Sequence, residues 1–320
     1  DEGNNTYFCM ATVTVLDTIA PVAICQPITT NLGSDGTVTI TGAMVGGQST
    51  DNCSNGLTYA LSQYTFNNFG TYDVTLTVTD ASGNSSTCET TVTVEDNTPP
   101  TAICKPDTIY LDASGNASIT GLDIDGGSTD NDSIVSYSAS PNSFSCLDIG
   151  QNASVLTVTD ASGNTDLCVS TVTVLDTIAP TVICHSITIP LGLNGTSTIV
   201  ATDIDGGSTD NCSNGALTYA ASQTLFDSAG VYSVTLTVTD GSGNSSNCVA
   251  TVTVNDVNPP NTICKDTTLY LDNNGNVSIT AHDLDGGSTD NGQIVSITAS
   301  QTVFDCGDLG SNQVVLSVTD

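Results

Sequence analysis

A short linker sequence occurs four times along this 320-residue chain at nearly constant spacing. It reads VLDTIAP at 15–21, VEDNTPP at 94–100, VLDTIAP at 174–180 and VNDVNPP at 254–260. The last proline of each copy follows the previous one by 79 or 80 residues. A constant period of this length indicates tandem modules that each fold around their own core. The linkers divide the chain into a segment at 1–17 and modules at 18–97, 98–177, 178–257 and 258–320, which we call the first to fourth modules.

Within each module, apolar residues alternate with threonine in short runs such as VTLTVTD at 74–80. This alternation indicates half-buried strands, and clusters of Gly, Asn and Asp separate them as turns. No stretch has a convincing helical period. The pattern predicts an all-β fold in which each module is a small β-sandwich. In the first module we expect strands at about 22–32, 37–43, 57–63, 64–69, 72–79 and 87–95.

The charge of the chain is strongly one-sided, with 34 acidic and 2 basic residues and a net charge of -32. Such a surface repels nucleic acid and anionic membranes, which excludes both as partners. The chain also has no apolar run long enough for direct insertion into a membrane. All acidic residues except Glu2, Glu89 and Glu95 are aspartates. Because the aspartates recur at fixed positions of the repeat, they favour ligand binding over general solubility.

The order of motifs resembles the hyalin repeat (HYR) module along essentially the whole chain. In the first module the motifs are Ile24-Cys25, Thr50-Asp51-Asn52-Cys53, the run VTDASGN at 78–84, and a last cysteine, Cys88. This resemblance implies an immunoglobulin-like domain of extracellular adhesive proteins and of large surface proteins of Bacteroidetes-type bacteria. It implies adhesion or scaffolding and no catalytic activity. The second and fourth modules depart from the pattern, because they lack the Asn-Cys pair and carry a later cysteine, Cys146 or Cys306, instead.

The twelve cysteines favour an oxidising compartment, and hence a secreted or cell-surface protein. In an immunoglobulin-like sandwich the first and last strands begin at the same pole, which implies the pairs Cys25–Cys88, Cys104–Cys168 and Cys184–Cys248. Opposite poles of successive modules face each other, which implies Cys146–Cys212 between modules. Zinc binding and thiol catalysis are the rival interpretations, but the chain has no Cys-x-x-Cys motif and only two histidines.

The two ends of the chain align with the repeat in a specific way. Asp1 aligns with Asp80, so residues 8–16 correspond to the last strand of a module, and the fourth module stops at Asp320, before that strand. Two interpretations stay open. The sequence is a window of a longer chain, or the N-terminal strand of one copy completes the fourth module of its neighbour. In the second case we expect intersubunit disulfides Cys9–Cys264 and Cys53–Cys306.

Aspartate-rich loops recur as DIDGGSTDN at 123–131 and 203–211 and as DLDGGSTDN at 283–291. We expect each loop to meet a linker aspartate and a turn aspartate at the pole that faces the previous module. Calcium takes six to eight oxygen ligands from flexible loops, and the arrangement is similar to the calcium-stiffened junctions of cadherins. Local hydrogen bonding in Asx turns is the alternative. The predicted Ca²⁺ ligands are Asp96, Asp123, Asp125, Asp130, Asp160, Asp176, Asp203, Asp205, Asp210, Asp240, Asp256, Asp283, Asp285, Asp290 and Asp320.

The first module has Ala43 and Val45 where the others have the Asp-x-Asp pair. We therefore expect its calcium site to be weak or absent.

Asp-Thr or Asp-Ser followed by a small or apolar residue resembles the O-glycosylation motif of Bacteroidetes. Such tripeptides also arise by chance in a chain rich in Asp and Thr. The candidate glycan sites are Thr18, Thr108, Ser133, Thr177, Ser228 and Thr267.

Together these features predict a subunit of an extracellular, head-to-tail fibre, stiffened by calcium and stabilised by disulfides, whose main partner is another copy of itself. The alternative is the stalk of a large cell-surface adhesin. A hydrolase with paired carboxylates would need its acids in a pocket, whereas these lie in repeated loops. The chain is therefore expected not to be an enzyme.

Overall fold

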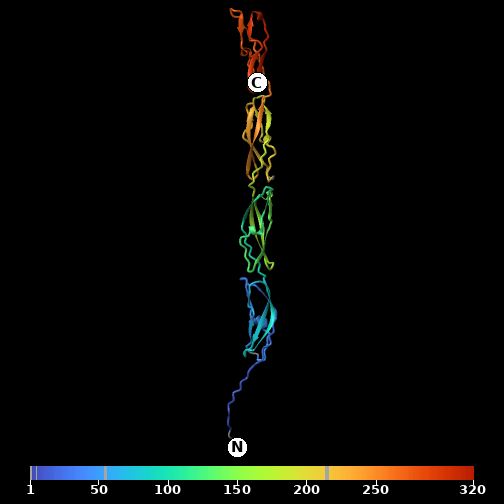
Figure 1. The fold of residues 1–320 in the computed structure, drawn as a ribbon, viewed down its shortest axis with the longest axis vertical. Coiled ribbons are helices and arrows are strands. Elements are labelled where there is room, and N and C mark those ends of the chain that lie inside the picture. The colour runs from blue at the N-terminus through green and yellow to red at the C-terminus, as the bar shows by residue number, and fades with distance from the viewer. Residues whose placement is uncertain (1, 5, 54–55, 213–215) are drawn as a thin grey trace. The chain divides into compact units, whose positions relative to one another are not determined.

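The computed structural model of the chain describes residues 2–4, 6–53, 56–212 and 216–320. It has two compact units. Unit 1 consists of Asp1–Ile109, Ala117–Phe144 and Asp148–Val174, and unit 2 of Tyr110–Asn116, Ser145–Leu147 and Leu175–Asp320. Strands dominate both units (Figure 1). The longest helix in the described part of the chain has five residues, so none is long enough to cross a membrane.

The first module forms a four-stranded sheet with the order β1-β6-β5-β3 and a two-stranded sheet β2-β4. Strand β1 pairs in parallel with the last strand β6, whereas β5 pairs antiparallel with both β6 and β3. This is the strand arrangement of an immunoglobulin-like sandwich. The strands are β1 (Ile28–Asn31), β2 (Val38–Thr39), β3 (Thr58–Leu61), β4 (Thr65–Phe66), β5 (Gly70–Thr79) and β6 (Ser85–Glu95), with helix α1 (Gly42–Gly46).

The second module repeats this topology with sheets β7-β12-β11-β9 and β8-β10. Its elements are β7 (Asp107–Tyr110), β8 (Asn116–Ser118), β9 (Ile134–Ser140), β10 (Ser143–Ser145), β11 (Gly150–Asp160) and β12 (Thr165–Leu175), with 3-10 helices η1 (Gly121–Asp123) and η2 (Cys146–Asp148).

The third module forms sheets β13-β18-β17-β15 and β14-β16, again with the first strand parallel to the last. Its elements are β13 (Ile187–Pro190), β14 (Ser197–Thr198), β15 (Thr218–Ala221), β16 (Leu225–Phe226), β17 (Gly230–Thr239) and β18 (Ser245–Asn255), with 3-10 helix η3 (Ala201–Ile204).

In the fourth module only two-stranded sheets, β19-β21 and β20-β22, occur among the described residues. Its elements are β19 (Asn276–Ser278), β20 (Ser296–Ala299), β21 (Val303–Asp305) and β22 (Leu316–Thr319), with 3-10 helices η4 (Ala281–Leu284) and η5 (Cys306–Asp308).

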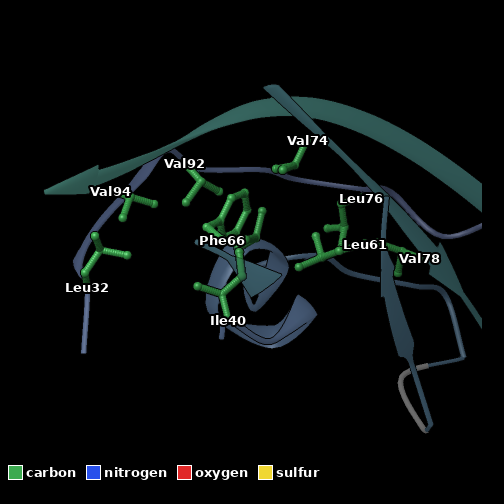
Figure 2. Close-up of a cluster of buried hydrophobic side chains, with 10 residues drawn as sticks. Leu32, Ile40, Leu61, Phe66, Val74, Leu76, Val78, Val92 and Val94 are labelled. Carbon is green, nitrogen blue, oxygen red and sulfur yellow. The ribbon is translucent and has the colours of Figure 1, made fainter. Parts of the chain in front are cut away.

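The core of the first module comes from alternate residues of its long strands. Val74, Leu76 and Val78 of β5 and Val92 and Val94 of β6 are at most 2% exposed. Because side chains alternate between the two faces of a strand, the valines lie on the inner face and the threonines between them on the outer face. In Figure 2 these side chains surround the Phe66 ring, together with Ile40, Leu61 and Leu32. The third module has the equivalent cluster around Phe226. The predicted fold class is thus confirmed: the chain is an all-β series of immunoglobulin-like sandwiches.

The structure differs from the expected strands at 37–43. Strand β2 covers only Val38–Thr39, and the chain then turns into helix α1. The glycines explain this difference, because a Cβ atom on Gly42 would lie 2.5 Å from Cβ of Tyr59, and one on Gly46 would lie 2.1 Å from Cδ2 of Leu76. Only glycines let this turn lie against the sheet. A helix of five residues is too short to have a visible sequence period.

The residues before the first sandwich lie in no strand from 6 to 21, as Figure 1 shows for the blue N-terminal segment. Their apolar side chains are exposed: Tyr7 is 94% exposed, Val13 81% and Val15 88%. The equivalent valines of β6, Val92 and Val94, are 0% and 2% exposed.

Candidate metal clusters

Three aspartates meet at the beginning of each of the later modules. In the second module they are Asp96, Asp130 and Asp160, and one carboxylate oxygen of each lies within 4.8 Å of the others. Asp96 follows strand β6, Asp130 lies in the Ser-Thr-Asp-Asn loop, and Asp160 ends strand β11. We call this the Asp96 cluster. The Asp176 cluster (Asp176, Asp210 and Asp240) and the Asp256 cluster (Asp256, Asp290 and Asp320) repeat it.

The main chain holds the Ser-Thr-Asp-Asn loop beside the linker. Thr101, just after the linker, and Thr129, just before Asp130, form an isolated antiparallel bridge. Their N–H groups donate to each other's carbonyl oxygens at 2.7 and 3.1 Å. The third and fourth modules repeat the bridge as Thr181–Thr209 and Asn261–Thr289. The linker and loop aspartates are thus brought together by backbone pairing.

In the Asp96 and Asp176 clusters an asparagine fixes the third aspartate, Asp160 or Asp240. The Asn164 backbone N–H donates to Oδ1 of Asp160 at 2.8 Å, and its side-chain Nδ2 donates to Oδ2 at 2.8 Å. The same Nδ2 also donates to the Asp96 carbonyl oxygen at 3.1 Å. In the first module the equivalent Asn84 amide lowers the pKa of Asp80. This asparagine therefore holds the linker and the turn in one fixed arrangement.

The clusters contain buried oxygens without a hydrogen-bond donor. Asp96 is only 5% exposed, and its Oδ2 atom is buried without a partner. Leaving a buried acceptor unpaired costs about 1–3 kcal/mol, and more when it is charged. In the described part of the chain, the buried side-chain atoms without a partner are all oxygens, on Asp51, Asp96, Asp130, Asn131, Asp132, Asp210, Asn211 and Asp290. Every one of these residues is a cluster aspartate or lies one or two positions after one, so these sites lack hydrogen-bond donors or a cation.

The second module adds a fourth carboxylate, Asp132. Burial is the main factor that raises its pKa, and the charges of Asp96, Asp130 and Asp160 raise it further. The equivalent positions in the other modules are Cys53, Cys212 and Gly292. The four sites therefore differ in charge, and the Asp96 cluster has the most carboxylates.

The first module also has a group of possible ligand atoms at this place, where the sequence predicts a weak or absent calcium site. Asp17, Asp51 and Cys53 bring one ligand atom each within 4.8 Å of the others, and Asp80 lines the same pocket. A hydrogen bond with Asp17 and the charge of that carboxylate raise the pKa of the Cys53 thiol. Sequence reasoning missed Asp17, Asp51 and Asp80, although each is the repeat equivalent of a predicted ligand. Ala43 and Val45 were misleading because their position lies outside the clusters.

The predicted Asp-x-Asp ligands lie elsewhere and have local partners. Oδ2 of Asp123 accepts from the N–H and hydroxyl of Thr120 at 2.7 and 2.8 Å, which caps helix η1. Oδ1 of Asp125 accepts from the Ser128 N–H at 3.0 Å and from its hydroxyl at 2.5 Å. The structure therefore does not bring these pairs into the clusters, and the Asx-turn alternative describes them. The same holds for the equivalent residues Asp203, Asp205, Asp283 and Asp285.

The structure contains four disulfides, and they join the four pairs expected from the sequence. Three lie within modules: Cys25–Cys88, Cys104–Cys168 and Cys184–Cys248. The fourth, Cys146–Cys212, joins the end of the second module to the Asn-Cys loop of the third. The cysteines expected in intersubunit bonds are free and exposed, namely Cys9, Cys53, Cys264 and Cys306.

The six candidate glycosylation residues are all exposed: Thr18, Thr108, Ser133, Thr177, Ser228 and Thr267.

No family model and no curated protein sequence matches the chain. Among solved structures it is similar to domains EC1-4 of the protocadherin PcdhgB3, with 14% identity, a TM-score of 0.32, and coverage of 76% of this chain and 77% of that one. Mouse cadherin-23 EC22-24 gives 15% identity, a TM-score of 0.28, and coverage of 74% and 99%. Titin domains I67-I69 give 11% identity, a TM-score of 0.32, and coverage of 74% and 97%. The fold assignment rests on the sheets and strand registers described above.

Proposed function

We propose that this chain is a structural protein of the HYR type that works outside the cell and associates head to tail into a fibre. Calcium at the aspartate clusters stiffens the module junctions, and disulfides hold the modules and their junctions together. No catalytic role is assigned to the carboxylates. The observation that carries the proposal is that two exposed, separate surfaces of the chain reproduce the two halves of its own Cys146–Cys212 junction.

The first of these surfaces is the turn of the fourth module. In the second module the Sγ atom of Cys146 lies 3.6 Å from the carbonyl oxygen of Gly115. In the fourth module the Sγ atom of Cys306 lies 3.7 Å from the carbonyl oxygen of Gly275. The thiol of Cys306 thus has the placement of a bonded cysteine while it is itself free and exposed.

The second surface is the Asn52-Cys53 loop of the first module. The Cys53 N–H donates to Oδ2 of Asp51 at 2.9 Å, and the Cys212 N–H donates to Oδ2 of Asp210 at 2.9 Å. The loop of the free cysteine therefore has the same local hydrogen bond as that of the bonded one. Head-to-tail docking of two copies would place Cys306 of one against Cys53 of the other, as Cys146 lies against Cys212.

Strand addition would complete the same junction. Among the described residues, strand β17 of the third module pairs with β15 and β18, and β22 pairs with β20. Accordingly, Val318 of the fourth module is half-buried, while Val238 at the equivalent position is 0% exposed. In the proposed fibre, residues 7–16 of a second copy pair with β22, with Val13 and Val15 on the inner face. Cys9 then meets Cys264, in the same way as Cys88 meets Cys25.

Calcium fits the clusters better than a softer metal does. The Asp96 cluster and its equivalents offer carboxylate and amide oxygens on loops, which is the donor set of hard cations. Three or four carboxylates at one site repel each other when no cation is bound. The disulfides support the oxidising compartment outside the cell. Because the chain has only two basic residues, Lys105 and Lys265, against 34 acidic ones, a bound cation is the natural source of compensation.

The proposal is tested on the 320-residue protein by electron microscopy and non-reducing electrophoresis with calcium. We expect filaments and a ladder of covalent multimers. Cys53→Ser with Cys306→Ser should remove one class of crosslink, and deletion of residues 1–16 should leave soluble monomers. Leu225→Ser, at an exposed residue of strand β16, is the matched control and should polymerise normally. A monomeric wild-type protein with an intact fold would contradict the fibre and favour the adhesin stalk.

A further inference from the structure

The asparagine that follows the loop aspartate has the same two contacts in three modules. Nδ2 of Asn131 donates to Oδ1 of Asp96 at 3.2 Å and to the carbonyl oxygen of Gly33 at 3.3 Å. Asp96 belongs to the linker cluster, whereas Gly33 lies in a turn of the first module. Asn211 repeats these contacts with Asp176 and Asp112, and Asn291 repeats them with Asp256 and Gly192, at 3.1–3.3 Å. One side chain therefore connects each cluster to the module before it.

These contacts fix which end of the amide faces the two acceptors. The atom near Asp96 Oδ1 and Gly33 O must be a donor, because an oxygen there would face two other oxygens. The Oδ1 atoms of Asn131 and Asn211 are consequently the free ends, and both are buried without a partner. Asn131 lies between Asp130 and Asp132, each of which also has an unpartnered buried oxygen. Unpartnered buried oxygens therefore occur on the asparagine and on the aspartates on either side of it, as well as on Asp96.

The backbone of this asparagine also contacts the preceding module. A Cβ atom on Gly36 would lie 2.2 Å from the carbonyl oxygen of Asn131, and one on Gly115 or Gly195 would lie 2.8 or 2.9 Å from that of Asn211 or Asn291. All three glycines have positive φ, from +73° to +77°. The turn and the asparagine are therefore in direct contact through both main chain and side chain. In the first module, Nδ2 of Asn52 donates to Oδ1 of its linker aspartate, Asp17, at 3.3 Å and to Sγ of Cys53 at 3.5 Å.

We infer that Asn131, Asn211 and Asn291 are cation ligands through Oδ1 and transmit cation binding to the preceding module through Nδ2. This inference rests on the proposed calcium sites and assigns a role to residues outside the aspartate set. The cation draws Oδ1 and the carboxylates toward itself, which fixes the amide plane. The fixed amide then holds the turn of the preceding module by its second hydrogen bond. Stiffening of a junction would thus depend on one neutral side chain.

Hydrogen exchange of the full-length, disulfide-intact protein with and without Ca²⁺ tests this role. In the wild type, we expect Ca²⁺ to slow exchange in the clusters and in the three turns at 33–36, 112–115 and 192–195. Asn131→Ala should abolish the effect at 33–36 only, and should weaken Ca²⁺ binding at that site by about tenfold or more, a loss typical even of residues that only support metal ligands. The other two turns serve as internal controls for folding.

Asn131→Asp separates the two halves of the role. It keeps an oxygen ligand but has no amide donor, so Ca²⁺ should still protect the Asp96 cluster and no longer protect the turn at 33–36. Asn142→Ala, at an exposed asparagine of the second module whose Oδ1 accepts from the Ser143 hydroxyl, is the matched control and should behave as wild type. Equal protection of 33–36 by Ca²⁺ in wild type and Asn131→Ala would overturn the inference while leaving the calcium sites intact. No effect of Ca²⁺ anywhere in the wild type would instead refute the calcium sites of the proposed function.

Discussion

Gly36 and Asn131 are in backbone contact so close that a Cβ atom on Gly36 would lie 2.2 Å from the Asn131 carbonyl oxygen. The φ angle of Gly36 is +73°, a conformation that costs an L-residue roughly 1–2 kcal/mol. Gly36→Ala should therefore destabilise the protein in two ways: its backbone would be strained at this φ angle, and its Cβ atom would displace the Asn131 loop. We expect a lower melting temperature and faster hydrogen exchange in the Asn131 loop.

Gly83→Ala is the control for this variant. Gly83 has a φ of +90° and no atom within 4 Å of its Cβ position, so the substitution has only the backbone cost. Equal losses of stability for the two variants would show that the contact between the turn and Asn131 contributes nothing.

Asp132→Asn should stabilise the cation-free protein at neutral pH. Burial and the neighbouring carboxylates raise the pKa of Asp132 above its ordinary value of 3.8, so its ionised form is disfavoured in the folded state. The stability of the wild type should therefore fall as pH rises from 3.8 toward the raised pKa of Asp132. The Asp132→Asn variant should not show this fall. Melting curves in chelator between pH 3 and 7 measure the difference.

The same variant should bind Ca²⁺ more weakly at the Asp96 cluster, because a carboxylate ligand is lost. Below the ordinary pKa of 3.8 the two proteins should have similar stability, since Asp132 is then protonated in both folded and unfolded states. A wild type that is more stable than the variant in chelator at pH 7 would contradict the charge repulsion.

Asp123→Asn should weaken the cap of helix η1 and leave calcium binding unchanged. Loss of a capping carboxylate costs about 1 kcal/mol, and hydrogen bonds from Thr120 lower the pKa of Asp123. The contribution of Asp123 is thus present above the ordinary pKa of 3.8 and disappears as pH falls through the lowered value. Denaturant unfolding measures the loss, and calorimetric titration with Ca²⁺ checks the site. Reduced Ca²⁺ affinity would restore Asp123 as a ligand.

Alkylation of the unreduced monomer should modify Cys9, Cys53, Cys264 and Cys306 and leave the other cysteines protected, since only these four are free and exposed. In polymeric material the same four should be protected as well. Peptide mapping by mass spectrometry identifies the modified residues. Modification of Cys146 or Cys212 in the monomer would show that the disulfide between the second and third modules is absent.

The sandwich fold could be predicted from the sequence, because the alternation of valine and threonine in a strand such as β6 shows which face is buried. The sequence was also sufficient for much of the clusters, since Asp96, Asp130 and Asp160 follow from the poles of an immunoglobulin-like module. The positions of Asp123 and Asp125, the Asp-x-Asp pair, could not be predicted in this way. Whether Asp123 reaches a cation or the N–H of Thr120 depends on the local turn, which period and spacing do not describe.

The role of Asn131 was also missed, although a signal existed. Asn52, Asn131, Asn211 and Asn291 occupy one position in all four modules, while the residue after them changes from Cys to Asp to Gly. An invariant amide beside a variable neighbour indicates a constraint on both its donor and its acceptor. What it contacts could not be inferred from the sequence, because the partner turn lies in another module, nearly one hundred residues earlier.

The connectivity of the disulfides determines how the chain would respond to tension. Tension applied at Cys25 of the first module is transmitted to Cys88 through the disulfide. The polypeptide between these cysteines, which includes most of the core, therefore carries no load. The part of β6 beyond Cys88 remains on the loaded path and pairs in parallel with β1. Tension along that strand would have to shear its hydrogen bonds together rather than open them one at a time. Each of the first three modules would therefore act as a nearly inextensible link, and stretch between these modules would be confined to the short segments between one module's last bridged cysteine and the next module's first.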